Sequence, residues 1–514
     1  MTEAHGTQSQ GTGSEGTEAH GPVAVLGAGI AGLTAAALLA RAGLKVDLLE
    51  AHHQSGGCAG TFRRGPYVFD VGATQVAGLE AGGIHARLFA HLHQTPPAAT
   101  PLDPACVVDL HDSQPPVQIW RDPLRWQAER QSQFPGSERF WQLCAWLHRT
   151  NWAFALRDPV LPPRSLWDLG QLCGALRPAT LISALATGTT VADLLTLCGC
   201  GHDQRLRRYL DLQLKLYSQE PADRTAALYG ATALAVAQEP QGLWHLEGSM
   251  QELSRALEDS LARWGGRLRL RHRARQLERR DGGWIVRGEK GGNTPFALAC
   301  EAVVCTLPPQ CLSDLLGEAL PAGYRQRLQH LHDPSGALVL YGAVPRSVLP
   351  PHTPSHLQLD WPSPGPLFVS VSQEGDGRAP QGQATVIASV FTPARPWFGL
   401  DETEYQARKA QAGTAMAAGL EQLLGIGSAD WLHRELATPR GFAGWTGRPW
   451  GYVGGLGQHP SRFGPFGLAS RTPLPGFWLG GDSIHPGEGT AGVSLSSLML
   501  CRQLLAERGE PLRI

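Results

Sequence analysis

Residues 23–50 read VAVLGAGIAGLTAAALLARAGLKVDLLE: an apolar strand, a glycine-rich turn, an alanine-rich helix and a second apolar strand that ends in Glu50. In the turn, Gly27 allows the tight bend, Gly29 lets the backbone approach a pyrophosphate, and Gly32 lets the helix pack close to the strand. The helix N-terminus attracts phosphate charge, and Glu50 is placed to accept hydrogen bonds from both hydroxyls of a ribose. The segment therefore predicts the βαβ unit of a dinucleotide-binding, Rossmann-like domain.

A second glycine-rich turn lies near the other end of the chain, where GGDSIHPGEGTAGVS (480–494) follows an apolar strand and precedes a helix to about Glu507. Asp482 is placed to accept a hydrogen bond from a ribityl hydroxyl or to order the pyrophosphate. If the cofactor is a flavin, backbone N–H groups near Gly492 and Val493 would face the edge of its ring that becomes negative on reduction. Two such turns, far apart in sequence, suit one extended cofactor held by a discontinuous domain.

Composition excludes several function classes. The net charge of −1 over 514 residues gives no overall field that would favour nucleic acid. The ten cysteines form no disulfide framework. Cys198-x-Cys200-x-His202 is the one spacing that suggests a metal, but no second ligand cluster accompanies it, so no metal site is predicted.

The first 21 residues are mostly Gly, Ser, Thr, Glu and His, and we expect them to form a disordered N-terminal tail. They lack the apolar core of a signal peptide. The chain also lacks an uncharged apolar run of about 20 residues, so no transmembrane helix is expected.

The motifs resemble the carotenoid desaturase and isomerase branch of the FAD-dependent amine oxidase-like superfamily, over nearly all of residues 22–510. The first glycine motif with Glu50 matches the FAD signature, GCAGTF (57–62) followed by FDVGA (69–73) resembles the second motif, and GGDS (480–483) with PGEG (486–489) matches the C-terminal one. Within this branch, the stretches most similar to the cyanobacterial-type carotenoid 3′,4′-desaturases are DRTAALYGAT (223–232), GLWHLEGSM (242–250) and PGEGTAGVS (486–494).

The resemblance implies an α/β fold with a Rossmann-like FAD-binding domain of the glutathione-reductase type, discontinuous in sequence, and a second α+β substrate domain. The second domain is expected to contain an antiparallel sheet and a helical insert. The predicted division is 22–84, 240–335 and 465–514 for the FAD-binding domain, 85–239 for a helical insert facing substrate and membrane, and 336–464 for the antiparallel-sheet domain.

The residues expected to hold FAD lie in the glycine motifs, at the end of the second strand and in the strand after Gly266. They are Gly27, Ala28, Gly29, Ile30, Ala31, Gly32, Glu50, Gly57, Cys58, Ala59, Gly60, Thr61, Arg63, Ala274, Gly481, Asp482, Gly489, Gly492 and Val493.

The sequence departs from the family pattern at two positions of this predicted FAD site. Cys58 stands where many members have arginine, which leaves Arg63 or Arg64 to supply positive charge to the diphosphate. A Ser249-Met250 pair replaces the common Gly-Met, and Ser249 with Glu252 predicts a capping box that opens the next helix. Since no evident side chain would anchor the flavin covalently, non-covalent FAD is expected.

The implied activity is desaturation of an apolar carotenoid by hydride transfer to flavin N5, with oxygen or a quinone as electron acceptor. His485 and Glu488 are the nearest candidates to accept the accompanying proton. The alternative is a cis–trans carotenoid isomerase that uses reduced FAD without net redox change; a third possibility is a binding protein without catalysis. Because carotenoids reside in the bilayer, we expect peripheral association with the cytoplasmic side of a membrane. Residues 135–155 and 166–197 carry apolar helical faces for this contact; the alternative is that these faces pack against the sheet.

Overall fold

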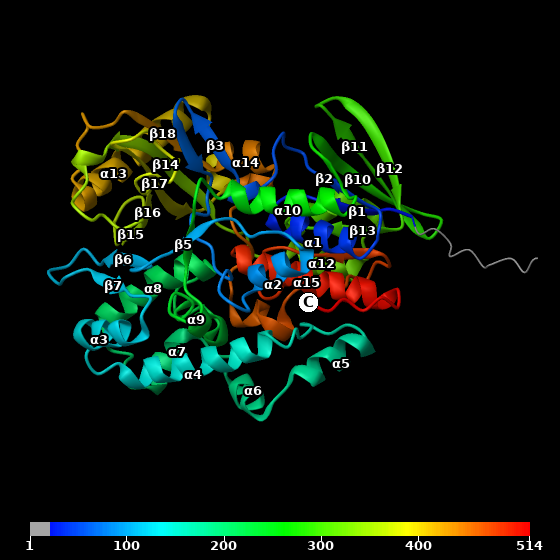
Figure 1. Ribbon diagram of the computed structural model, residues 1–514, viewed down its shortest axis with the longest axis horizontal. Helices are drawn as coiled ribbons and strands as arrows, with labels where there is room; N and C mark the ends of the chain where they lie inside the picture. The colour runs from blue at the N-terminus through cyan, green and yellow to red at the C-terminus, as the bar shows by residue number, and fades with distance from the viewer. Residues whose placement is uncertain (1–20) are drawn as a thin grey trace, which may run out of the picture.

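The computed structural model describes residues 21–514, so the predicted tail lies almost wholly outside the described residues. A five-stranded parallel sheet, ordered β19-β13-β1-β2-β9, forms the centre of the part shown at the upper right of Figure 1. Its strands come from distant parts of the chain: β1 (Val23–Leu26), β2 (Val46–Leu49), β9 (Arg267–Arg269), β13 (Ala302–Cys305) and β19 (Phe477–Leu479). This arrangement confirms the predicted discontinuous Rossmann-like fold.

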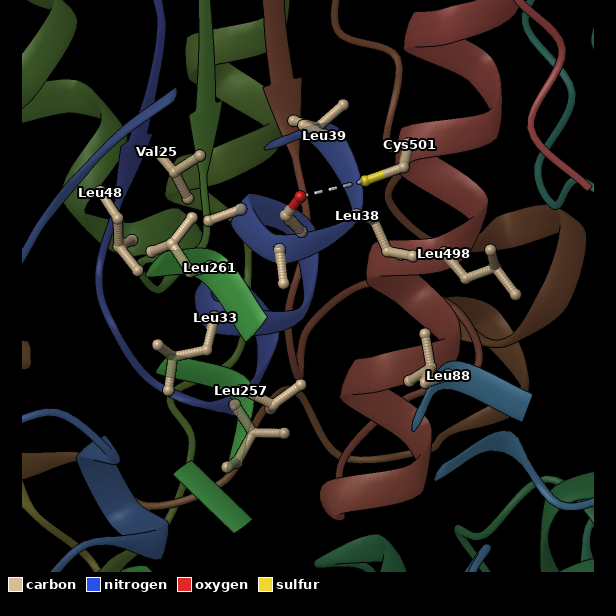
Figure 2. Close-up of a cluster of buried hydrophobic side chains, with 14 of the residues drawn as sticks. Val25, Leu33, Leu38, Leu39, Leu48, Leu88, Leu257, Leu261, Leu498 and Cys501 are labelled. Carbon is tan, nitrogen blue, oxygen red and sulfur yellow. Dashed lines mark hydrogen bonds between the residues drawn. The ribbon is translucent and has the colours of Figure 1, made fainter. Parts of the chain in front are cut away.

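Helix α1 (Ile30–Arg41) is almost entirely buried because it packs between two other helices, α10 (Gln251–Arg263) and α15 (Thr490–Glu507). Figure 2 shows leucines of the three helices meeting in this core, together with Leu88 of α2 (Ile84–Leu92). The small residues of α1 permit this close approach: the Sγ atom of Cys501 lies 3.6 Å from the carbonyl oxygen of Ala35. The packing fixes the start of α1 relative to the start of α15.

The predicted capping box at the start of α10 is wrong. The helix begins at Gln251, and its N-cap residue, Met250, makes no side-chain capping bond. Instead, the Met250 N–H donates to Asp70 Oδ1 at 2.8 Å and the Gln251 N–H donates to Thr61 Oγ1 at 3.2 Å. These acceptors belong to the hairpin of β3 (Thr61–Arg64) and β4 (Tyr67–Asp70), so the cap is supplied by tertiary structure.

A seven-stranded sheet, ordered β18-β14-β17-β16-β15-β6-β7, forms the second layer, at the upper left of Figure 1. Helix α13 (Glu402–Leu424) packs on one face of it. Five strands form the expected antiparallel sheet: β14 (Gly336–Pro345), β15 (His356–Leu359), β16 (Leu367–Val371), β17 (Gln383–Thr392) and β18 (His433–Ala437).

The segment expected to be mostly helical also contributes strands, which corrects that expectation. β6 (Cys106–Asp109) pairs in parallel with β15, and β7 (Val117–Ile119) pairs antiparallel with β6, because their alternate side chains are buried. The helices of the segment are α3 (Pro123–Gln133), α4 (Glu138–Ala155), α5 (Leu166–Ala175), α6 (Pro178–Ser183), α7 (Val191–Leu197), α8 (Gln204–Ser218) and α9 (Ala227–Ala233).

Smaller elements complete the fold. A three-stranded antiparallel sheet, ordered β10-β11-β12, lies at the upper right of Figure 1, and two short strands far apart in sequence, β5 and β8, pair antiparallel. These elements and the remaining helices are β5 (Ala99–Pro101), β8 (Trp244–Leu246), β10 (His272–Arg280), β11 (Gly283–Lys290), β12 (Thr294–Cys300), α11 (Leu312–Leu316), α12 (Ala322–Gln329) and α14 (Pro439–Thr446). Among residues 21–514, no helix is both long and apolar enough to cross a membrane.

A buried charged cluster joins the β3–β4 hairpin to the second sheet. The Arg378 guanidinium, whose side chain is 4% exposed, donates to Asp70 Oδ2 at 3.1 Å and to Asp376 Oδ2 at 3.2 Å. It also contacts His245 Nε2 at 2.9 Å. A buried arginine needs such partners to offset its lost hydration. The cluster therefore fixes the hairpin, and the glycine-rich loop before it, against the antiparallel sheet.

Candidate cofactor and active site

A continuous cavity of about 1100 Å³ lies between the two large sheets and extends to the helices α4, α5, α6 and α9. Fourteen predicted cofactor residues line it: Gly27, Gly29, Ile30, Ala31, Glu50, Gly57, Cys58, Ala59, Ala274, Gly481, Asp482, Gly489, Gly492 and Val493. Both predicted proton acceptors, His485 and Glu488, line it as well. Ala28, Gly32, Gly60, Thr61 and Arg63 are outside its lining.

The first glycine motif forms a cradle that opens into this cavity. Gly27 has a φ of +93°, and a Cβ atom on Gly32 would lie 1.8 Å from the Gly27 carbonyl oxygen, so both positions require glycine. A Cβ atom on Gly29 would meet no heavy atom within 4 Å among the described residues. The helix N-terminus behind it carries no acidic residue in its first turn. An open, electropositive cradle of this kind fits a diphosphate.

Glu50 follows β2 and closes the cradle from the other side. Its Oε2 accepts the Ala28 N–H at 2.7 Å, and its Oε1 accepts the His52 N–H at 2.8 Å. Burial raises the pKa of this carboxyl. Each carboxylate oxygen can accept a second hydrogen bond, so the position also suits the predicted ribose contact.

The structure does not bring Arg63 to the cavity. Its side chain is exposed on β3, while Arg64 forms a 2.9 Å ion pair with Glu435. Four other arginines line the cavity: Arg87 and Arg275, which pair with Asp158 and Glu289, and also Arg273 of β10 and Arg448. Arg273 and Arg448 are far from the glycine motifs in sequence, and no local sequence pattern distinguishes them from other arginines.

Arg448 and Asp482 form an ion pair at the second glycine-rich turn, with side chains 12% and 16% exposed. Arg448 also donates to the carbonyl oxygen of Gly454 at 2.8 Å. The pair therefore joins the loop after α14 to the turn before α15, where backbone N–H groups at the helix N-terminus line the cavity.

Replacing Arg448 by methionine is expected to destabilise the protein by about 3 kcal/mol, because it leaves Asp482 poorly hydrated and without its cation. FAD affinity is expected to fall roughly 10-fold or more, since the turn loses its support. Urea unfolding and flavin fluorescence titration measure the two effects. The control is Arg63→Met, which removes an exposed arginine and should change stability by less than about 0.5 kcal/mol. An FAD affinity lowered equally by both substitutions would contradict this assignment.

His485 and Glu488 differ in electrostatic environment although they are three residues apart. Burial lowers the pKa of His485 to about 4, so its imidazole is neutral at physiological pH. Burial raises the pKa of Glu488 to about 8, against the opposing effect of a hydrogen bond from Gln219. Glu488 is therefore the group of the two that changes protonation near neutral pH.

The remainder of the cavity is mostly apolar. From the second sheet, Val339, Phe368 and Phe391 line it, and from α5 Leu172 and the following Leu176 do so. Helices α5 and α6 lie along the lower edge of the molecule in Figure 1. Large apolar side chains are exposed on these helices and on the residues directly after them, and we call this set the α5–α6 apolar surface: Leu166, Leu169, Leu181, Ile182 and Leu185. Leu156, at the end of α4, is exposed as well and also lines the cavity.

The exposed charged residues around this surface are all positively charged. Between residues 156 and 188, the exposed charged side chains are Arg157, Arg164 and Arg177. The two acids of the same stretch are turned inward, where Asp158 pairs with Arg87 at 2.9 Å and Asp168 pairs with Arg471 at 3.2 Å. The exterior is thus apolar and positively charged, and the interior of the same helices lines the cavity.

No group of three or more His, Cys, Asp or Glu side chains suited to a metal ion occurs in the part of the chain from residue 21 onward. Cys198 and Cys200 are free thiols.

Solved structures share this fold. Wild-type putrescine oxidase bound to putrescine superposes with a TM-score of 0.64 at 17% identity, covering 95% of this chain and 99% of that one. An oxidoreductase from Methanosarcina mazei gives 0.62 at 15% identity, covering 93% and 99%. At such identities the similarity concerns the fold alone.

Two curated relatives align over 94% of this chain. Prolycopene isomerase from Arabidopsis thaliana is 24% identical, with 82% of its own length covered, and hydroxyneurosporene desaturase from Cereibacter sphaeroides is 26% identical, with 97% covered. Residues 25–92 match the model of an NAD(P)-binding Rossmann-like domain, and residues 201–505 match that of the flavin containing amine oxidoreductases. With the open cradle described above, these matches identify the protein as an FAD-dependent oxidoreductase. The chain belongs to the family of flavin containing amine oxidoreductases.

Proposed function

We propose that the protein is a carotenoid desaturase that introduces a C=C bond into an apolar carotenoid, with 3′,4′-desaturation as the specific reaction. One observation carries the proposal: the residues around the cofactor cradle line the same cavity as a long apolar region bounded by α4, α5, α6 and α9. A polyene has few polar groups to bind, so an apolar cavity beside the flavin site fits it. The similarity to hydroxyneurosporene desaturase supports the reaction class.

In this proposal FAD is bound non-covalently, with its diphosphate at the Gly29 cradle and its flavin near the turn that contains Asp482. When bound, FAD supplies the oxidant that takes up a hydride from the substrate. The protein's own part is to orient the substrate against the apolar face of β14, β16 and β17, where Val339, Phe368 and Phe391 line the cavity. These side chains also exclude water from the reacting carbons.

We further propose that residues 85–239 form the substrate- and membrane-facing part, and that the α5–α6 apolar surface rests on the cytoplasmic side of a membrane. Apolar side chains ringed by arginines suit the interface of a bilayer with anionic lipids. Since helices of this surface also line the cavity, a carotenoid would pass from the bilayer to the flavin without crossing water. The electron acceptor in this proposal is oxygen or a quinone.

A cis–trans carotenoid isomerase that uses reduced FAD is the second candidate. The observation that favours it is the 24% identity to prolycopene isomerase over 94% of the chain. The same cavity would accept either substrate, and the two reactions differ in whether hydrogen leaves the carotenoid.

The experiment that separates these functions is product analysis with FAD-loaded protein and carotenoids in liposomes. All-trans and poly-cis carotenoids are tested with the flavin oxidised or reduced. A product lighter by two hydrogens, formed only with oxidised flavin, supports the desaturase. A product of unchanged mass with trans geometry, formed only with reduced flavin, identifies the isomerase and overturns the desaturase proposal.

A further inference from the structure

The side-chain amide of Gln219 holds one oxygen of Glu488 and leaves the other free. Gln219 Nε2 donates to Glu488 Oε2 at 2.6 Å, and the Gly455 N–H donates to the same oxygen at 3.2 Å. Glu488 Oε1 is buried and has no hydrogen-bond partner within residues 21–514. The carboxyl group of Glu488 therefore has one oxygen held by hydrogen bonds and one without a partner. Glu488 is also one of the residues that line the cavity.

Gln219 is itself held in place on all sides. Gln219 is the C-cap residue of α8 and has a left-handed backbone conformation, with a φ of +60°. Its side chain contacts the 453–455 loop. Its Oε1 accepts the Ser335 N–H at 2.9 Å. Its second N–H is shared between the carbonyl oxygens of Val453 and Gly455, which lie 3.3 Å and 3.1 Å from Nε2. The amide orientation is thereby fixed, with the N–H₂ group towards Glu488.

Gly454 lies directly against the hydrogen bond between Gln219 and Glu488, with no room for a side chain. A Cβ atom at this position would lie 2.1 Å from both Gln219 Nε2 and Glu488 Oε2, and the φ of +71° also favours glycine. Any larger residue would force the amide and the carboxyl apart. The contact therefore joins three segments: the end of α8, the 453–455 loop and the turn before α15.

The charges around Glu488 come from several elements. After burial and the hydrogen bond from Gln219, the charged groups that act on Glu488 are Asp482, which raises its pKa, and Arg448, which lowers it. Cys58 and Tyr229 are also close enough for their own pKa values to be raised by Glu488, after the larger effect of burial. The result, a carboxyl with a pKa of about 8, exists in both protonation states near neutral pH.

We propose that Glu488 accepts the substrate proton and that Gln219 is the positioning residue that holds its carboxyl group at the wall of the cavity. The inference rests on the proposed desaturation. In that reaction two C–H bonds break and one C=C π bond forms. One hydrogen leaves with its electron pair to FAD, the oxidant, and the other leaves as a proton to the Glu488 carboxylate. The second C–H electron pair becomes the π bond, so atoms and electrons balance.

The test is a pH titration of the Glu488 carboxyl in FAD-loaded protein by infrared difference spectroscopy, with Glu488→Gln to identify its band. Methionine at position 219 has a similar length but no N–H, so Gln219→Met removes a donor that stabilises the carboxylate. We expect the titration midpoint to move alkaline by about one pH unit. The matched control is Gln213→Met, a buried glutamine of the same helix that bonds Gln358 instead.

Activity gives the second readout. Desaturation requires the carboxylate, so the rate should rise with pH through about 8 in the wild-type protein and at higher pH in Gln219→Met. Glu488→Gln should lose this rise and about 100-fold in rate. An infrared midpoint that Gln219→Met leaves unchanged overturns the positioning role, and a pH–rate profile that Glu488→Gln leaves unchanged overturns the proton transfer. If the infrared shift occurs but no protein converts a carotenoid, the proposed function fails and the proton transfer with it.

Discussion

Replacing Gly29 by alanine is expected to weaken FAD binding roughly 10- to 100-fold while the protein remains folded. The φ of −71° and ψ of 179° at this position are accessible to alanine, and the new methyl group would contact nothing else in the described structure. It would instead occupy the space in which the diphosphate meets the backbone. Overpacking a filled site costs about 1–3 kcal/mol, which corresponds to this loss of affinity.

Flavin fluorescence titration and thermal unfolding of the apoprotein measure the two parts of this prediction. Gly170→Ala is the matched control, since it adds a methyl group to an exposed position on α5 outside the cavity. Gly32→Ala should behave differently, because its Cβ atom would meet backbone and impair folding. Undiminished FAD affinity in Gly29→Ala would contradict the placement of the diphosphate.

Replacing Leu181, Ile182 and Leu185 together by glutamine is expected to reduce liposome binding about 100-fold. The three side chains are 57%, 59% and 83% exposed, so each would gain further burial in a bilayer. Full burial of such a side chain is worth about 1.5–3 kcal/mol, and a loss of about 3 kcal/mol in total corresponds to a 100-fold change. FAD content should stay unchanged, since none of the three lines the cavity.

Co-sedimentation with vesicles of neutral and anionic lipid measures this binding. The control is Leu124→Gln, which removes a leucine that is 75% exposed on α3 and lies outside the α5–α6 apolar surface. Anionic lipid should strengthen wild-type binding because of Arg157, Arg164 and Arg177. Equal sedimentation of the triple variant and the wild type would show that this surface is not the membrane contact.

The parts of the site that the sequence predicts are those encoded locally. The turn from Gly27 to Gly32 and the acid at Glu50 belong to one βαβ unit, whose spacing fixes their geometry. Helix α13 also follows from local signals, since Asp401 caps it and its apolar side chains recur with helical period.

Contacts between segments far apart in the chain have no local sequence pattern from which they could be predicted. The cap of α10 comes from Asp70 and Thr61, which are 180 and 190 residues from their partners. Gln219 and Glu488 are 269 residues apart, and nothing near Gln219 distinguishes it from a surface glutamine at a helix end. The short strands β6 and β7 were likewise hidden within a helix-rich segment, because three or four residues carry too little periodicity.

The most direct test of the central claim, that one cavity brings FAD and a membrane-derived polyene together, is anaerobic mixing of the FAD-loaded protein with carotenoid-containing liposomes. Flavin absorbance and carotenoid mass are followed together. The proposed desaturation predicts that the flavin bleaches and that the carotenoid loses two hydrogens per flavin reduced, with no bleaching in carotenoid-free liposomes. A flavin that stays oxidised beside unchanged carotenoid would contradict the desaturase account.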